Sequence, residues 1–306
     1  MTSTLIFLSL FFMANTSYGN VPLAIKVPAK LMNTLKSFEP SAIQFLSATG
    51  NYLVAIDDTT EEDAPFLFLM DTNGNVDKTP VVIEGLSKMT DMESLSQENG
   101  YVYVMSSQSR NKKGKILKER NLFVRGKLNG HVLGGTTVIE LRAELIKALG
   151  AVSDTRISSM QATFDKLIEI ESHYIKNGVV YVGLKDSQSR PGVGLVLEIG
   201  KADSIFALGK LDPAQIRVSN ELDFTKSGGT EEKISDISLQ KDGSLLVTAT
   251  LENGGGSIWS YEGQDLRLVM SYENERPEGI TFSDDGKVIV VFDQGTETPL
   301  YTFLKD

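Results

Sequence analysis

Short runs of alternating apolar and polar residues recur along most of the chain, and each is followed by a polar turn and a second such run. Four segments show the pattern clearly: DMESLSQENGYVYVMSS (91–107), EIESHYIKNGVVYVGLKD (169–186), KISDISLQKDGSLLVTAT (233–250) and PEGITFSDDGKVIVVFD (277–293). Alternation with period two is typical of half-buried β-strands. The Asn-Gly and Asp-Gly pairs in the turns supply the positive φ that tight hairpins need. The pattern therefore predicts a β-hairpin in each segment.

The four hairpins look like copies of one repeat, because each begins with an acidic residue at a similar distance from its turn glycine. That distance is seven positions in three copies and eight in the last. The interval from Asp236 to Glu278 is near the length of one four-stranded propeller blade. A weaker fifth copy covers residues 41–58, where Ser41 or Glu39 stands near the place of the acid. We therefore expect an all-β fold, a β-propeller of about six blades at roughly 40–50 residues a blade.

One segment breaks the strand pattern. Residues 137–149 place four apolar side chains on one face of a helix, Gly150 follows as a C-cap, and residues 158–168 form a second helical stretch. We expect a short helical insertion around 137–168. Its apolar stripe either packs against the blades as filler or lets the insertion cover one face of the propeller as a lid.

The start of the chain has the features of an export signal. The first 19 residues carry no charged side chain, and their apolar run, residues 5–14, is too short to span a bilayer. We interpret residues 1–19 as a signal peptide. Residues 20–306 are then expected to form a single propeller domain that is periplasmic or secreted. Because no Lys or Arg precedes the apolar run, a buried N-terminal strand is the alternative. No other apolar run approaches the length of a membrane span.

Composition narrows the function classes. The chain has no cysteine, which excludes disulfides, thiolate metal sites and a cysteine nucleophile. Its formal net charge of −10 repels phosphate backbones, and the basic cluster within residues 112–125 is interpreted as a solvated loop, so nucleic-acid binding is not expected. The sequence contains no P-loop, G-x-S-x-G or H-E-x-x-H motif.

The repeated acids are the main candidates for function. In a propeller, equivalent positions of each repeat form a ring, so Glu93, Glu171, Asp236 and Glu278 should meet near one mouth of the central channel. Carboxylates about 8 Å apart at an effective dielectric near 20 repel by about 2 kcal/mol per pair. A bound cation, Arg or Lys partners, or protonation would relieve this. Oxygen ligands favour Ca²⁺ or Mg²⁺. Alternatively, each acid caps a turn or accepts backbone N–H groups independently.

Two further patterns could contribute to a site. The tetrapeptide Ser-Gln-Ser-Arg occurs twice and ends at Arg110 and at Arg190, and two guanidinium groups on one face could hold a phosphate or carboxylate. They could equally neutralise the acids or belong to ordinary loops. His173 lies two residues after Glu171, so strand alternation places both on one face. His173 is a candidate general base or metal ligand, and a satisfied core histidine is the alternative.

The four repeat segments, taken in order, resemble a bacterial β-propeller family of unknown function, related to the esterase-like and phytase-like propellers. The resemblance covers about residues 39–303, and "PEGI" (277–280) is also similar to a motif of lactonase-type six-bladed propellers with a central divalent cation. His173 and the residue before it depart from the family pattern of Gly and an apolar residue. By position, the resemblance implies metal ligands at Asp91, Glu93, Glu171, Asp236, Glu278 and Asp293.

Two classes of function remain. A metal-assisted hydrolase of phosphoesters or esters would use Ca²⁺ at the acids, Glu171 or His173 as the base, and Arg110 and Arg190 on the substrate anion. A non-catalytic module of the cell envelope would instead bind a small anionic ligand or a partner protein. The fold alone does not choose between them.

Overall fold

The computed structural model describes residues 21–185, 190–227, 231–295 and 297–304. The expected signal peptide, residues 1–19, lies outside the described residues. So do the first three residues of the second Ser-Gln-Ser-Arg motif. Export and the extent of the domain therefore stay predictions.

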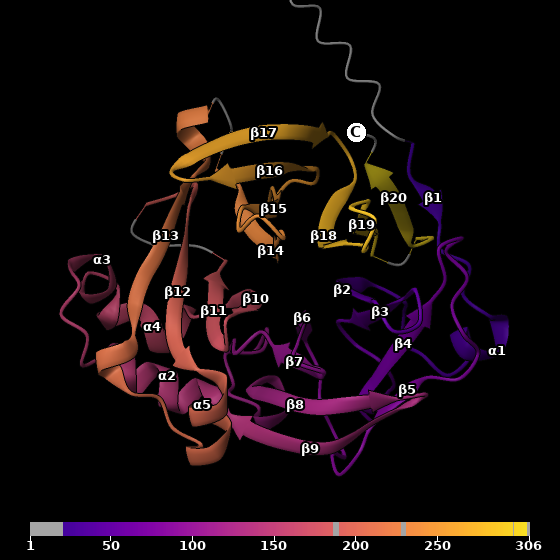
Figure 1. Cartoon of the computed structure of the whole chain (residues 1–306), viewed down its shortest axis with the longest axis horizontal. Coiled ribbons are helices and arrows are strands. Elements are labelled where there is room, and N and C mark those ends of the chain that lie inside the picture. Colours follow the sequence, from indigo (N-terminus) through magenta and orange to yellow (C-terminus); the bar gives the residue numbers. More distant parts are fainter. Residues whose placement is uncertain (1–20, 186–189, 228–230, 296, 305–306) are drawn as a thin grey trace, which may run out of the picture.

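The described strands form five four-stranded antiparallel units, two of which are joined into one sheet by a parallel pair of strands. Figure 1 shows the units arranged around a central axis. Each unit runs from an innermost to an outermost strand, and the units are called blades 1 to 5. Blade 1 contains β2 (Pro40–Leu46), β3 (Asn51–Ile56), β4 (Phe66–Met70) and β5 (Val81–Ile83); blade 2 contains β6 (Met92–Glu98), β7 (Tyr101–Ser106), β8 (Leu122–Asn129) and β9 (Val132–Glu140). Blade 3 contains β10 (Ile170–Lys176), β11 (Val179–Leu184), β12 (Val193–Lys201) and β13 (Arg217–Asp223). Blade 4 contains β14 (Lys233–Leu239), β15 (Leu245–Thr250), β16 (Gly256–Glu262) and β17 (Asp265–Tyr272); blade 5 contains β18 (Arg276–Phe282), β19 (Val288–Asp293), β20 (Leu300–Leu304) and β1 (Leu23–Ala24).

The inner strands close into a ring. β2, β6, β10, β14 and β18 each contact the next, and β18 contacts β2 again. This confirms the expected all-β propeller, but the described strands give five blades rather than about six. The estimate was too high because it divided the chain by a standard blade length. Residues 141–167, between β9 and β10, form helices instead of strands, and the connection from β7 to β8 is a long loop.

The chain itself closes the ring. The short strand β1, near the start of the described chain, is the outermost strand of blade 5, where Leu23 pairs with Tyr301 and Ala24 with Leu300. Ile25 continues the contact, since its backbone N–H donates to the carbonyl of Pro299 over 2.8 Å and its side chain is buried. Blades 1 and 2 are further joined by a parallel pairing of their outer strands β5 and β9.

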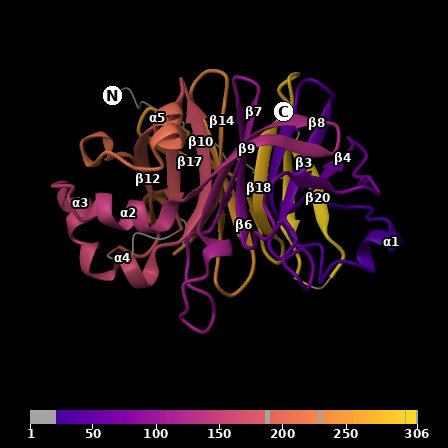
Figure 2. The same ribbon diagram turned by 90° about the horizontal axis from the view of Figure 1, so that it is seen from below.

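The helices lie outside the blades. They are α1 (Ala29–Met32), α2 (Leu141–Leu149), α3 (Thr155–Ser158), α4 (Gln161–Leu167) and α5 (Ala202–Leu208), with short 3₁₀ turns η1 (Lys118–Arg120), η2 (Pro213–Gln215) and η3 (Phe224–Ser227). Seen edge-on, α5 lies toward one face of the disc and α4 toward the other (Figure 2).

The helical insertion begins later than expected. Residues 137–140 belong to β9, because Thr137 and Val138 pair with residues of β8. From Leu141 the chain turns helical, and α2 buries Leu141, Leu145 and Leu149 in the core that spans blades 2 and 3. The apolar stripe therefore packs as filler. No helix of the described chain is long and apolar enough to cross a membrane.

Candidate functional site at one mouth of the central channel

A polar cavity of about 760 Å³ opens at the end of the disc where the inner strands begin. Residues from blades 1, 2, 3 and 5, the loop after β7 and the end of α4 line it. Its acidic lining residues are Glu39, Asp57, Asp58, Asp91, Glu93, Glu169, Glu171, Glu278 and Asp293. Its basic lining residues are Arg110, Lys112, Lys113, Arg120, Lys166, Lys185 and Arg276. The mouth thus combines a carboxylate-rich interior with several cations.

Every inner strand has a β-bulge near its start, and the five bulges together form a ring around this mouth. At each bulge one extra residue has no partner on the second strand of its blade, and the strand bends. The five extra residues are Ser41, Glu93, Glu171, Ser235 and Glu278. Four of the five line the cavity, and the hydroxyl of the fifth, Ser235, donates a hydrogen bond to Thr250 Oγ1 over 3.0 Å. Of the two candidates in the weaker first copy, Ser41 rather than Glu39 occupies the position equivalent to the acids.

The alignment of Asp236 with the other acids was wrong. Ser235 occupies the equivalent position, and Asp236 is the next residue, paired with Thr248. The error arose because the turn after β14 spans residues 240–244, longer than the two-residue turns after β6 and β10. The carboxylate of Asp236 is buried and accepts N–H groups from Ile237 (2.8 Å) and from Ile280 of the next blade (2.9 Å). It therefore fits the alternative of an acid that satisfies backbone donors.

The bulge also separates His173 from Glu171. Because the extra residue breaks the alternation of β10, His173 points into the core between β6 and β10 and not into the cavity. Its Nε2 lies 2.8 Å from the hydroxyl of Ser96, and its ring packs edge-on against Phe123 at 5.3 Å. Burial lowers the pKa of His173 to about 3. The expectation of a shared face was thus wrong, and this environment is that of a core histidine.

Lys185 neutralises part of the acid ring. Its ammonium lies 3.1 Å from Glu171 Oε1 and 3.1 Å from Glu169 Oε1. Burial by itself would lower the pKa of Lys185, but the carboxylates of Glu171 and Glu169 outweigh it and raise that pKa. Burial raises the pKa of Glu171 well above its usual value, with Lys185 opposing the shift. One of the remedies expected for clustered acids, a basic partner, is therefore present.

Arg276 plays the same part in blade 5. Its guanidinium lies 3.3 Å from Glu278 Oε1 and 3.6 Å from Asp293 Oδ2. Burial nevertheless raises the pKa of Glu278 to about 7, because the nearby charges of Arg276 and Lys185 only partly offset the loss of solvent. At neutral pH, Glu278 is thus poised between its two protonation states.

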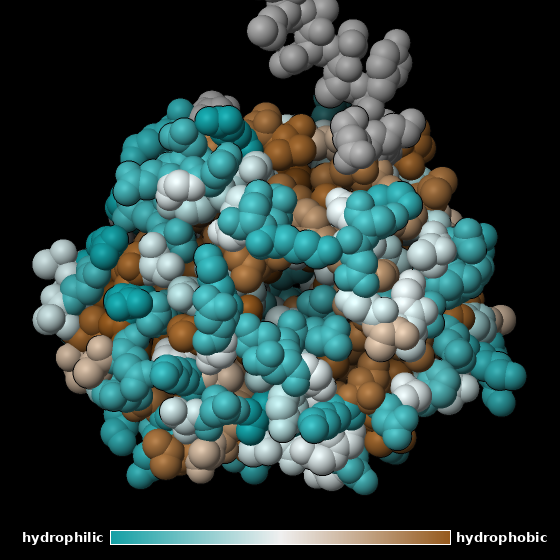
Figure 3. Space-filling model, in the orientation of Figure 1, coloured by the Kyte–Doolittle hydropathy of each residue, from teal (hydrophilic) through white to brown (hydrophobic). Residues whose placement is uncertain are grey.

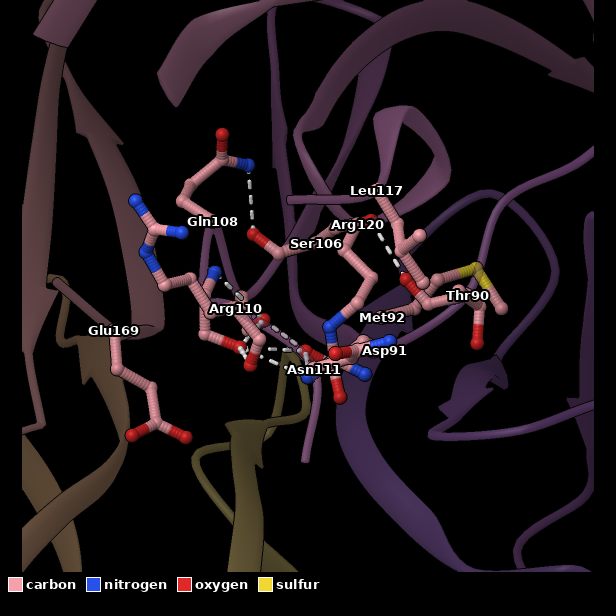
Figure 4. A network of polar contacts seen from close by, with 12 residues as sticks. Thr90, Asp91, Met92, Ser106, Gln108, Arg110, Asn111, Leu117, Arg120 and Glu169 are labelled. Carbon is pink, nitrogen blue, oxygen red and sulfur yellow. Dashed lines mark hydrogen bonds and ion pairs between the residues drawn. The ribbon is translucent and has the colours of Figure 1, made fainter. Parts of the chain in front are cut away.

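The most crowded acids lie at the junction of blades 1 and 2. Carboxylate oxygens of Asp57, Asp91 and Glu93 all lie within 4.8 Å of one another. Burial and the charge of Asp57 raise the pKa of Asp91 well above its usual value, and burial and Glu171 do the same for Glu93. Arg120 forms an ion pair with Asp91, as Figure 4 shows. No other described Lys or Arg forms an ion pair with any of these three acids.

The backbone holds this cluster at the blade junction. Asp91 adopts a left-handed conformation (φ 58°), which Asp tolerates better than most residues. Its N–H donates to the carbonyl of Asp57 in blade 1, and its carbonyl accepts from Ser107, each over 2.8–2.9 Å. The carbonyl of Ser107 accepts in turn from Ile170 in blade 3. The main chain thus links three blades around the acids.

The two arginines of the repeated tetrapeptide lie apart. Arg110 lines the acid cavity, where its side chain contacts Asp165 in α4 with an Nη2 to Oδ2 distance of 2.6 Å. Arg190 lines a different and smaller pocket and forms ion pairs with Glu221 and Asp223. The two guanidinium groups therefore lie in different pockets, and they do not form a joint anion site.

Asp57 of the carboxylate cluster and the basic partners Arg120, Lys185 and Arg276 were not assigned to the mouth from the sequence. For three of them, the position relative to the predicted strands is a signal in the sequence. Asp57 directly follows β3, Lys185 directly follows β11, and Asp293 is the last residue of β19. All three therefore lie at the end of the second strand of their blade. Arg276 begins β18, two positions before Glu278. Arg120 lies in a loop outside the repeat, and no periodicity marks it.

No protein-family model matches the chain, and no curated protein matches its sequence. Solved structures of similar shape include a glucose dehydrogenase, with 11% identity over 89% of this chain and 98% of the other and a TM-score of 0.46. A luciferin-regenerating enzyme has 11% identity over 93% and 80%, with a TM-score of 0.44. The soluble aldose sugar dehydrogenase of Escherichia coli has 9% identity over 93% and 99%, with a TM-score of 0.48. Likeness at this level says nothing about activity.

Proposed function

We propose that the chain is a divalent-cation-dependent hydrolase of a phosphoester or carboxylic ester, acting at the acid mouth of the propeller. The observation that supports it is the cluster of Asp57, Asp91 and Glu93, with oxygens within 4.8 Å of one another, inside a cavity that also carries seven Lys and Arg residues. We further propose export through residues 1–19, to the periplasm or the medium.

The donor set suits a hard cation. The three acids supply only oxygen, which is the ligand type that Ca²⁺ and Mg²⁺ prefer. A cation bound there would supply Lewis-acid polarisation of the substrate oxygen and a lower pKa for a bound water. Burial raises the pKa of Asp57, Asp91 and Glu93, and the charge of Asp57 adds to the rise at Asp91 and Glu93, so the free cluster is electrostatically unfavourable. Ca²⁺ is the first choice because its flexible coordination tolerates irregular carboxylate sets.

The basic side chains at the mouth favour an anionic substrate. Arg110, Lys112 and Lys113 lie on the loop after β7, and Lys166 lies at the end of α4 on the same cavity. In a concave site, such cations raise the local concentration of anions and can contact phosphate or carboxylate oxygens. The substrate class that fits is an ester with at least one negative charge beside the scissile bond.

Glu278 is the best candidate for a general base. It faces the same cavity, and its pKa of about 7 matches the pH at which a carboxylate base is most useful. Glu171, the base expected from the sequence, is held by Lys185 at 3.1 Å. In this proposal Glu171 keeps Lys185 in place and Glu278 accepts the proton.

One observation favours a non-catalytic alternative. Lys185 and Arg276 already pair with Glu171, Glu278 and Asp293, so those acids need no cation for charge balance. Under this alternative the mouth binds a small anion through its rim cations and transfers no group.

The test is a hydrolase screen of the purified mature chain on phosphomonoester, phosphodiester and carboxylic ester substrates, each with Ca²⁺, Mg²⁺ or EDTA. The proposal expects turnover that EDTA abolishes and added Ca²⁺ restores. It also expects Glu278→Gln to lower kcat at least tenfold, because the base is lost. The alternative expects no turnover on any substrate, together with thermal stabilisation by inorganic phosphate or a carboxylate.

A further inference from the structure

A second large cavity lies between blades 1 and 5, at the end of the disc opposite the acid mouth. Its volume is about 740 Å³, which is within the usual range for a small-molecule site. The turns after β2 and after β18 border it, and the side chains of Phe45, Tyr52, Phe303 and Leu304 form its apolar walls. Figure 3 views this end of the disc, where hydrophobic areas interrupt a mostly hydrophilic surface. None of these residues takes part in the acid mouth.

Tyr52 contributes a hydroxyl group to the aromatic wall of this cavity. The residue is only 1% exposed, and its ring packs against Phe45 with a centroid distance of 5.4 Å. Its hydroxyl makes no hydrogen bond to any other described residue. Burial and the charge of Asp285 raise the pKa of Tyr52 to about 12, so the hydroxyl remains a proton donor at neutral pH. A buried tyrosine hydroxyl usually has a partner, and here the open side is the cavity.

The charges at the rim are already paired within the protein. The ammonium of Lys287 lies 2.6 Å from Asp285 Oδ2. The carboxylate of Asp284 accepts a hydrogen bond from the hydroxyl of Ser47 over 2.8 Å. An ionised ligand would lose its hydration without gaining an opposite charge, and burying such a charge is costly.

We propose that this cavity binds a neutral aromatic molecule that carries a carbonyl or ether oxygen. The ring packs between Phe45, Phe303 and Leu304, and the oxygen accepts the hydrogen bond of Tyr52. The site is separate from the acid mouth, and the proposal does not depend on the hydrolase activity.

Three naphthalene probes separate the parts of this proposal: 2-acetylnaphthalene, 2-isopropylnaphthalene and 2-naphthoate. They share the ring and differ in bearing a neutral acceptor, no acceptor or a negative charge. Fluorescence titration of the mature chain should show 1:1 binding of 2-acetylnaphthalene. Its affinity should exceed that of 2-isopropylnaphthalene by about 3- to 10-fold, the value of one hydrogen bond. Binding of 2-naphthoate should be at least about tenfold weaker than that of 2-acetylnaphthalene.

Variants place the probe in the cavity. Tyr52→Phe should lower the affinity for 2-acetylnaphthalene about 3- to 10-fold and leave that for 2-isopropylnaphthalene unchanged. Tyr272→Phe is the control, because Tyr272 has a buried hydroxyl without a partner among the described residues and lies outside the cavity. Thr72 is exposed at the rim, so Thr72→Trp should narrow the opening and weaken both neutral probes without disturbing the core.

Several results would overturn the proposal: no saturable binding of 2-acetylnaphthalene, equal or tighter binding of 2-naphthoate, or an affinity that neither Tyr52→Phe nor Thr72→Trp changes. The Thr72 variant keeps the proposal testable if Tyr52→Phe fails to fold. Cation binding at the acid mouth should be the same in every variant.

Discussion

Two acids of the inner strands differ in what they contact, and this difference separates a candidate ligand from a structural residue. Glu93 is the extra residue of a bulge and faces the cavity, whereas Asp236 accepts two backbone N–H groups. We predict that Glu93→Gln weakens Ca²⁺ binding at least tenfold without lowering the free energy of unfolding, because the amide keeps the shape of the side chain and cannot repel the neighbouring carboxylates. Calorimetric titration and urea denaturation measure the two effects.

Asp236→Ala is the converse case. It should lower the free energy of unfolding by about 1–3 kcal/mol, since the N–H groups of Ile237 and Ile280 lose their acceptor, and leave Ca²⁺ affinity unchanged. If Asp236→Ala abolished cation binding while Glu93→Gln did not, the assignment of the two acids would have to be reversed.

His173 should make stability depend on pH. Its folded-state pKa of about 3 lies below the ordinary value of 6.5, so the unfolded chain binds the proton first as the pH falls. Its contribution to the free energy of unfolding is complete above pH 6.5. As the pH falls toward 3, this contribution is lost by about 1.4 kcal/mol per pH unit. The difference in unfolding free energy between the protein and His173→Gln should therefore shrink on going from pH 7 to pH 5. A difference that stays constant would show that His173 keeps its proton equilibrium on folding.

At the residue scale, the sequence located the acids better than their partners. The repeat pattern marked Glu93, Glu171 and Glu278, which line one cavity; their role as metal ligands stays a prediction. It could not reveal that Lys185 pairs with Glu171, because that contact joins two strands and depends on side-chain reach. Nor could it mark Arg120, which reaches Asp91 from a loop.

At the element scale, close packing of the inner strands limits residue size. A Cβ on Gly279 in β18 would lie 2.8 Å from Val291 Cγ2 and 3.0 Å from the backbone of Ala42 in β2. Gly279→Ala should therefore lower the free energy of unfolding by about 1–3 kcal/mol through overpacking. Gly150→Ala, after α2, meets only ordinary contacts and serves as the control in the same denaturation series. Equal stability of both variants would mean that blades 5 and 1 are less tightly packed than described.

Hairpins were the elements that the sequence predicted best, since alternation and Asn-Gly or Asp-Gly turns are local signals. Their bulges were not predictable, because a bulge shows only in the pairing of two strands. That is why the shared face of Glu171 and His173 was wrong. The start of α2 was placed too early because Val138 and Ile139 suit a helix stripe as well as the strand that they form. α5 was not predicted.

At the scale of the whole molecule, closure of the ring depends on a short strand. Ile25 follows β1 and is 3% exposed, whereas Leu23 within β1 is 54% exposed. Ile25→Ala should lower the free energy of unfolding by about 2–5 kcal/mol, the usual cost of truncating a buried isoleucine. Leu23→Ala, on the same segment, should change it by less than about 0.5 kcal/mol. Similar small effects of both would show that this segment does not hold blade 5 closed.

The propeller class followed from the repeat, but the number of blades did not. Blade count depends on how much chain each blade uses for loops and insertions, and the spacing of copies gives only an upper limit. The second cavity, between blades 1 and 5, was invisible in the sequence, because Tyr52 and Phe303 are about 250 residues apart and meet only when the ring closes.

The central claim is that the carboxylates at the junction of blades 1 and 2 bind a divalent cation. Its most direct test is calorimetric titration of Ca²⁺ and Mg²⁺ into the metal-free mature chain and into the variant Asp57→Asn. The control variant is Glu221→Gln, because Glu221 pairs with Arg190 outside the cavity. We predict one saturable site in the protein and in Glu221→Gln, and at least tenfold weaker binding in Asp57→Asn. Absence of saturable binding at millimolar cation, or equal affinity in all three proteins, would contradict the claim.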